Sequence, residues 1–135
     1  MNVFVDTSAL YALLVRNEEE HEAVSGAFLA LLEQQQGLAT TNYVLVETTA
    51  LLQRRIGLAA VRDLAERIVP LVTVHSISEA VHRRAQEHML RSDRRGLSLV
   101  DCTSFEVMER EGLVEALALD ADFAEAGFRV LPSQG

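Results

Sequence analysis

With 135 residues, 49% hydrophobic and 24% charged, the chain has the size and composition of one globular domain. Its formal net charge of −8 argues against nucleic-acid binding through a broad basic surface, although a cluster of metal-binding carboxylates also makes a chain acidic. All twelve basic residues are arginines, so mechanisms that need a catalytic lysine are excluded.

The sequence has no pattern typical of a membrane or secreted protein. No apolar run approaches the roughly 18 residues that a membrane span requires. The N-terminus lacks a basic leader and Asp6 interrupts its apolar stretch, so we expect no signal peptide. The single cysteine, Cys102, cannot form an internal disulfide, and we therefore expect a cytoplasmic protein.

Short β-branched and aromatic runs alternate with amphipathic segments along the whole chain. The first half predicts a strand at 3–5, helices at 7–15 and 18–32, a strand at 38–40, helices at 42–55 and 58–68, and a strand at 71–74. The second half predicts a helix at 78–91, an arginine-rich loop at 92–96, a helix at 98–111, a strand at 116–119, a helical turn at 121–126 and a strand at 129–131. This alternation predicts a single α/β domain over 1–135, with a mainly parallel sheet covered on both faces.

Two aspartates follow predicted strands, where a parallel sheet places its ligands. Asp6 comes directly after the first strand and Asp120 directly after a later one, so both side chains can project into one crevice. Asp122 lies two residues beyond Asp120 and could approach the same ion. Aspartate is also common as a helix N-cap or turn residue, and that structural role explains each position equally well.

Glu47 lies on an otherwise apolar face of its predicted helix, beside Tyr43, Val44 and Leu51. A glutamate in such a place carries a desolvation cost unless a positive group meets it. Either an arginine, with Arg54 as a candidate, or a cation shared with other carboxylates would meet this need.

Asp101 lies three residues after Ser98, the spacing of a capping box in which aspartate replaces glutamate. The capping role explains the residue completely. The start of a helix is also where a side chain faces the crevice at the strand ends, so Asp101 remains a candidate ligand.

Other catalytic patterns are missing from the sequence. It contains no glycine-rich phosphate loop, no Cys-x-x-Cys pair and no Gly-x-Ser-x-Gly. The four histidines lack zinc spacing, and we interpret them as surface or packing residues.

Four segments together resemble the motifs of PIN-domain proteins. They are VDTSAL at 5–10, TNYVLVET at 41–48, LSLVD at 97–101, and LDADF at 119–123 with GF at 127–128. Their order and spacing hold over essentially the whole chain. The short single-domain form is most similar to the VapC-like toxins of toxin–antitoxin pairs.

The resemblance implies a three-layer α/β/α fold and a metal site formed by Asp6, Glu47, Asp101 and Asp120, with Asp122 as a further candidate. It also implies an RNA substrate, a homodimer and a cognate antitoxin. Many relatives carry Thr or Ser two residues before the fourth-motif aspartate, where this chain has Ala118. A hydroxyl beside the metal ligands is therefore either missing or supplied by Thr7.

These features predict a ribonuclease in which the carboxylates hold Mg²⁺ or Mn²⁺ at a phosphodiester of single-stranded RNA. The predicted phosphate contacts are Arg94 and Arg95, or alternatively Arg54 and Arg55. The alternatives are a non-catalytic binding protein of the same fold and an aspartate-based phosphotransfer or phosphatase domain. The second alternative is weakened because those enzymes use a lysine.

Overall fold

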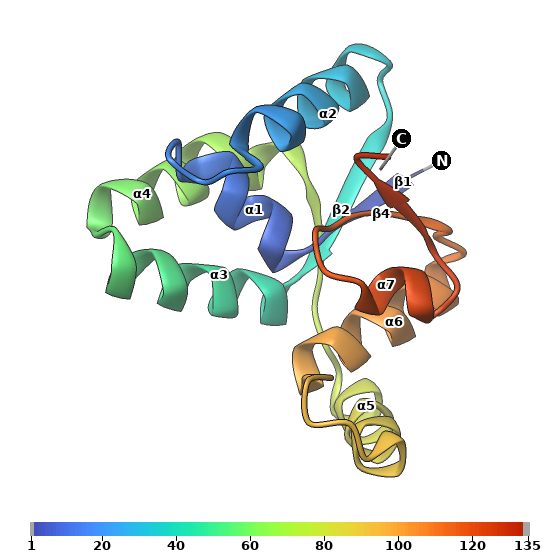
Figure 1. Cartoon of the computed structure of the whole chain (residues 1–135). Coiled ribbons are helices and arrows are strands. Elements are labelled where there is room, and N and C mark those ends of the chain that lie inside the picture. Colours follow the sequence, from blue (N-terminus) through green and yellow to red (C-terminus); the bar gives the residue numbers. More distant parts are fainter. Residues whose placement is uncertain (1, 134–135) are drawn as a thin grey trace.

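The computed structural model describes residues 2–133 and contains a five-stranded parallel sheet (Figure 1). The strands are β1 (Asn2–Val5), β2 (Gly37–Thr41), β3 (Thr73–His75), β4 (Glu115–Leu117) and β5 (Arg129–Leu131). They are ordered β3-β2-β1-β4-β5, and every pair is parallel. β1 is therefore central, with Phe4 opposite Ala39 of β2 and Ala116 of β4.

Helices cover both faces of the sheet, as the alternating pattern predicts. The helices are α1 (Thr7–Leu14), α2 (His21–Glu33), α3 (Asn42–Arg55), α4 (Leu58–Asp63), α5 (Glu79–Ser92), α6 (Leu99–Glu111) and α7 (Asp122–Glu125). Helices α1 to α4 lie on one side of the sheet and α5 to α7 on the other (Figure 1). The three-layer α/β/α fold is confirmed. No helix in the described part of the chain is long and apolar enough to cross a membrane.

Side-chain caps begin the helices that matter most for the crevice. Asp6 caps α1 through the amide of Ser8, and Thr41 caps α3 through the amide of Val44. Ser98 caps α6, and the predicted capping box with Asp101 is present. These caps satisfy amides that a helix N-terminus leaves without partners, so they fix where each helix leaves the sheet edge.

Several predicted boundaries are wrong for identifiable reasons. The acidic run 18–20 lies in turns, and α2 begins only at His21. The predicted helix 58–68 changes after Asp63 into a π-helical turn (Leu64–Ile68), and a 3₁₀ turn (Val69–Leu71) containing Pro70 delays β3 to residue 73. β4 ends at Leu117 rather than 119. The Ala118 amide still donates to the Leu131 carbonyl of β5, but the Leu119 amide donates to the Ser8 hydroxyl and leaves the sheet.

Aromatic side chains form the core beneath α6 and α7. Phe123 is fully buried, and its ring lies 5.0 Å from that of Phe105 in an edge-on contact and 6.1 Å from that of Phe4. Phe128 lies 5.8 Å from Phe105. The short α7 is thus attached to the central strand by apolar contact.

Replacing Phe123 with alanine should lower the free energy of unfolding by about 3–5 kcal/mol, because it leaves a cavity among three other rings. Urea unfolding followed by circular dichroism measures the change. Val46→Ala, at a side chain 68% exposed, is the control and should change stability by no more than about 0.5 kcal/mol. A similar small loss in Phe123→Ala would contradict this account of the core.

Candidate metal centre

Three carboxylates converge where the carboxyl ends of β1 and β4 lie side by side. Asp6 follows β1, Asp120 lies in the turn after β4, and Asp101 lies in the first turn of α6. One oxygen from each carboxylate lies within 4.8 Å of the others. The chain winds outward from β1 to β3 and then crosses back to β4, so the crevice lies where the winding reverses. Open parallel sheets bind ligands at such a point.

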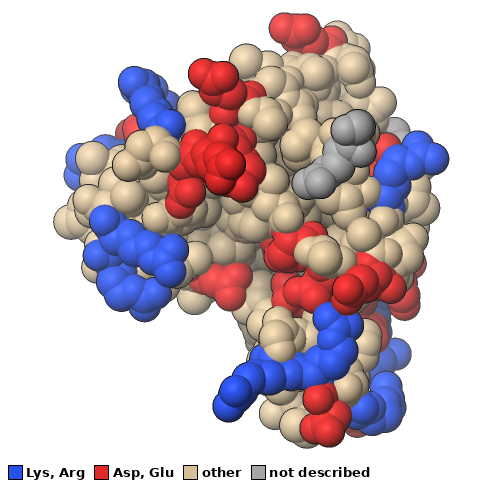
Figure 2. All heavy atoms as spheres, in the orientation of Figure 1, with Lys and Arg blue, Asp and Glu red and all other residues tan. Residues whose placement is uncertain are grey.

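The surface around the crevice is acidic in the middle and basic at its margins. Figure 2 shows carboxylates gathered between α3 and α7, with arginines on both flanks of this band. The local distribution therefore differs from the uniformly negative surface that the net charge suggests, because positive side chains border the acidic band.

Asp6 is the most enclosed of the three carboxylates, with only 2% of the residue exposed. Its Oδ2 accepts the Ser8 hydroxyl at 2.8 Å and the Ser8 amide at 3.2 Å. Burial raises the pKa of Asp6 to about 7, the Ser8 hydroxyl opposes this rise, and the charges of Asp120 and Asp101 add to it. Asp6 therefore combines a helix cap with a carboxylate that is costly to ionise.

Ser8 holds the two sides of the crevice together. Its hydroxyl donates to Asp6 and accepts the backbone amide of Leu119 at 2.9 Å. Thr7, predicted as one source of the hydroxyl that Ala118 lacks, donates its hydroxyl to the carbonyl oxygen of Val44 at 3.5 Å. The sequence contains one indication of this role. Ser8 lies two residues after Asp6, a spacing at which a serine side chain can hydrogen-bond to the capping aspartate.

Asp101 is both a cap and a member of the converging set. Its Oδ2 accepts the Ser98 amide at 3.3 Å, and its own amide donates to the Ser98 hydroxyl at 3.0 Å. Burial raises the pKa of Asp101 to about 6, against the lowering effect of the Ser98 amide and with further raising by Asp120. The capping and ligand interpretations are therefore compatible in the structure.

Asp120 is the most exposed member of the set, and its Oδ1 accepts the Asp122 amide at 3.2 Å. Burial raises its pKa, and the charges of Asp122 and Glu47 raise it further. Those two acids are therefore close by, although neither belongs to the converging set.

Glu47 and Asp122 have different neighbours. Glu47 is half-buried on α3, one turn after Tyr43, whose hydroxyl lies 2.6 Å from Nδ1 of His82 on α5. Asp122 is paired with the Arg94 guanidinium at 2.9 Å. The Tyr43–His82 contact, which sequence analysis does not anticipate, fixes the helix that carries Glu47.

The four predicted arginines lie outside the converging set. Arg94 and Arg95 are exposed in the loop before α6, and Arg54 and Arg55 are exposed at the end of α3. Arg55 lies over the ring of Tyr11, 5.6 Å from its centroid.

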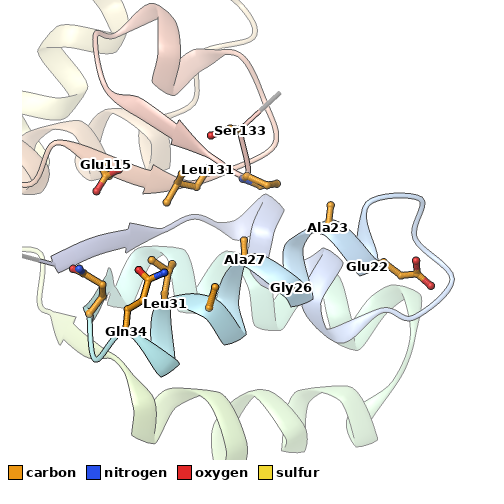
Figure 3. A pocket seen from close by; sticks show the side chains of 12 residues that line it. Glu22, Ala23, Gly26, Ala27, Leu31, Gln34, Glu115, Leu131 and Ser133 are labelled. Carbon is orange, nitrogen blue, oxygen red and sulfur yellow. The ribbon is translucent and has the colours of Figure 1, made fainter. Parts of the chain in front are cut away.

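A groove of about 530 Å³ lies elsewhere, between α2 and the end of β5 (Figure 3). Ala23, Ala27 and Leu31 form its floor, and its two acids, Glu22 and Glu115, lie at opposite ends. It therefore has an apolar lining and no converging carboxylates, unlike the crevice beside β1.

Residues 3–129 match the family model of the PIN domain. The chain belongs to the PIN-domain family. This PIN domain is 38% identical over 127 residues to the 23S rRNA-specific endonuclease VapC20 of Mycobacterium tuberculosis, in strains CDC 1551 / Oshkosh and ATCC 25618 / H37Rv. The alignment covers 93% of this chain and 95% of each relative.

The crystal structure of Mycobacterium tuberculosis VapC20, described as a Sarcin-Ricin loop cleaving toxin, has the same fold. Its TM-score is 0.81 at 38% identity, over 93% of this chain and 95% of that one. The predicted resemblance to VapC-like proteins is confirmed.

The metal-free PIN domain should lose stability as the pH rises from about 4 to about 7. Burial holds the pKa of Asp6 at about 7, against 3.8 for an ordinary aspartate, so the folded chain retains a proton that the unfolded chain releases. The stabilisation that this retained proton provides is complete below pH 3.8 and is lost as the pH rises through about 7. Thermal unfolding in EDTA measures the effect, which we expect to exceed about 1 kcal/mol.

Asp6→Asn is the matched variant, because asparagine keeps an N-cap but does not ionise. It should be more stable than the natural chain at the alkaline end in EDTA, with a shallower pH dependence. An unchanged pH dependence would show that another group is responsible.

Proposed function

We propose that this PIN domain is a metal-dependent endoribonuclease that hydrolyses phosphodiester bonds of single-stranded RNA, and that it is the toxin of a toxin–antitoxin pair. The observation that carries the proposal is the convergence of Asp6, Asp101 and Asp120 at the point where the chain reverses its direction across the sheet. Similarity to the endonuclease VapC20 over 93% of the chain supports the same activity.

The donor set fits Mg²⁺ or Mn²⁺. Carboxylate oxygens are the hard ligands that both ions prefer. Burial and mutual repulsion raise the pKa of Asp6, Asp101 and Asp120, so a cation between them would relieve an unfavourable concentration of charge. The bound ion would supply Lewis acidity at the phosphodiester and lower the pKa of the attacking water.

The remaining residues of the crevice position these groups. We assign to Glu47 the orientation of the attacking water and the acceptance of its proton, because it lies beside Asp120 without joining the converging set. Ser8 fixes the carboxylate of Asp6 through the 2.8 Å hydrogen bond. Ser98 does the same for Asp101 through the capping box.

Arginines at the margins of the acidic band are proposed to contact RNA phosphates. Arg95 is exposed and has no ion pair among residues 2–133, so its guanidinium is available to a phosphate. Arg94 lies beside it but already contacts two carboxylates. Arg54 and Arg55 provide a second basic group at the end of α3.

The same proposal includes a cognate antitoxin that blocks the crevice, a homodimer, and action in the cytoplasm on RNA. Exposed apolar side chains provide contact surface for protein partners, among them Val46, Leu58 and Leu90.

Purified protein should cleave labelled RNA in Mg²⁺ or Mn²⁺ and not in EDTA. The panel should include the sarcin–ricin hairpin of 23S rRNA, because VapC20 is described as cleaving that loop. Asp101→Asn keeps the cap but removes the charge, and should reduce cleavage by at least about a hundredfold while remaining folded.

Asp63→Asn, at an exposed ion pair with Arg67 on α4, is the matched control and should cleave normally. If the metal raises the melting temperature but no RNA is cut, the centre is supported and the substrate assignment is wrong. If neither response occurs, the binding-protein alternative is favoured.

Ser8→Ala should weaken Mn²⁺ binding by about tenfold, because groups that orient metal ligands typically have effects of this size. The Leu119 amide also loses its partner, so unfolding should become easier by about 1–2 kcal/mol. Calorimetric Mn²⁺ titration and urea unfolding measure the two effects. Ser25→Ala on α2 is the control, and unchanged Mn²⁺ affinity in Ser8→Ala would refute the role of the hydroxyl.

A further inference from the structure

Arg94 connects the loop before α6 to both acidic side chains of α7. Its Nη2 lies 2.9 Å from Oδ1 of Asp122 and 2.9 Å from Oε2 of Glu125. The Arg94 side chain is 49% exposed and that of Asp122 only 19%. A guanidinium held by two carboxylates is not free for a phosphate, so its position requires an explanation other than RNA contact.

The two connected segments carry the ligands proposed above. The loop that holds Arg94 leads through Leu97 to the α6 cap and Asp101. The turn before α7 carries Asp120, whose carboxylate Oδ1 accepts the backbone amide of Asp122 at 3.2 Å. The N-cap residue of α7, Ala121, has no side-chain hydrogen bond to the helix, and the ion pairs with Arg94 attach α7 to the loop before α6.

Asp122 is close to the converging carboxylates but separate from them. Its negative charge raises the pKa of both Asp101 and Asp120, which places it within electrostatic range of each. Its oxygens nevertheless lie outside the set that can share one ion. The ion pair with Arg94 accounts for the separation, since it engages one oxygen of Asp122 on the side of the loop before α6.

We propose that Arg94 is a positioning residue that holds Asp122 out of the metal centre and thereby limits the centre to three converging carboxylates. The inference rests on the proposed metal-dependent function. Without Arg94, Asp122 is free to turn toward the ion and to compete with an RNA phosphate for it. Arg94 thus acts through Asp122 and not through the substrate.

A double-mutant cycle of Arg94→Gln and Asp122→Asn tests the proposal, with Mn²⁺ affinity measured by calorimetry at one fixed pH. Arg94→Gln should bind Mn²⁺ at least about threefold more tightly, because a positive charge is lost and a carboxylate is released. Asp122→Asn should weaken binding by less than about threefold when Arg94 is present and by about tenfold when it is absent. This difference between the two backgrounds is the result expected if Arg94 restrains Asp122.

Cleavage of the sarcin–ricin hairpin at saturating Mn²⁺ provides the second readout. Arg94→Gln should cleave more slowly, and the added Asp122→Asn substitution should restore the rate. Arg94→Lys keeps the charge and should retain most of the natural Mn²⁺ affinity. Arg83→Gln is the matched control, because Arg83 forms an exposed ion pair with Glu79 on α5 at 2.8 Å, away from these carboxylates.

Four outcomes would overturn the proposal. Equal effects of Asp122→Asn in both backgrounds would show that no restraint exists. Loss of Mn²⁺ binding in Asp122→Asn alone would make Asp122 a ligand, and a cleavage defect in Arg94→Gln without altered Mn²⁺ affinity or rescue would make Arg94 an RNA contact. If the natural chain binds no Mn²⁺, the proposed function fails as well, whereas the first three outcomes leave it intact.

Discussion

Repulsion between three carboxylates at the junction of β1 and β4 is the constraint on which the arrangement of this chain depends. Bringing Asp6, Asp101 and Asp120 together costs free energy, and burial of Asp6 increases the cost. The chain meets this cost with hydrogen bonds made by the backbone and by two serines. Ser8 fixes Asp6 and the turn that follows β4, and Ser98 fixes Asp101. The carboxylates are therefore held in place before any cation arrives, which is the condition for a preorganised site.

The core beneath the crevice supplies the rigidity that this arrangement needs. Phe4 lies in the central strand two residues before Asp6, and Phe123 lies three residues after Asp120. Their rings pack together, with centroids 6.1 Å apart. Close-packed interiors transmit displacement rather than absorb it, so contact between these rings keeps the segments that carry Asp6 and Asp120 in register. Apolar packing below the carboxylates and hydrogen bonds to the carboxylates themselves thus hold the same segments in place.

Local patterns predicted most of the fold, because strands and helices depend on nearby residues. The run Val3 to Val5, the α3 segment and the Ser98 capping box all have strong local signals, and all three are present. Alternation of elements also predicted the parallel sheet. The end of β4 and the hydroxyl contact of Ser8 depend on a partner 111 residues away, so no local pattern contains them. The pairing of Arg94 with Asp122 across 28 residues is hidden for the same reason. The sequence predicted which acids approach the crevice, but only the tertiary contacts separate those that converge from those that are held aside.

The dual use of Asp6 and Asp101 as helix caps has an evolutionary consequence. Asparagine is as good an N-cap as aspartate, so a single nucleotide change in the codon of Asp6 would remove a charge and leave α1 capped. The same substitution at Asp101 preserves the geometry that begins α6. If the proposed metal centre is the catalytic one, a lineage released from selection for catalysis can lose activity through a single substitution and still keep the folded domain. Inactive descendants of this domain would remain folded and could acquire binding roles. Asparagines at these two positions would identify their origin.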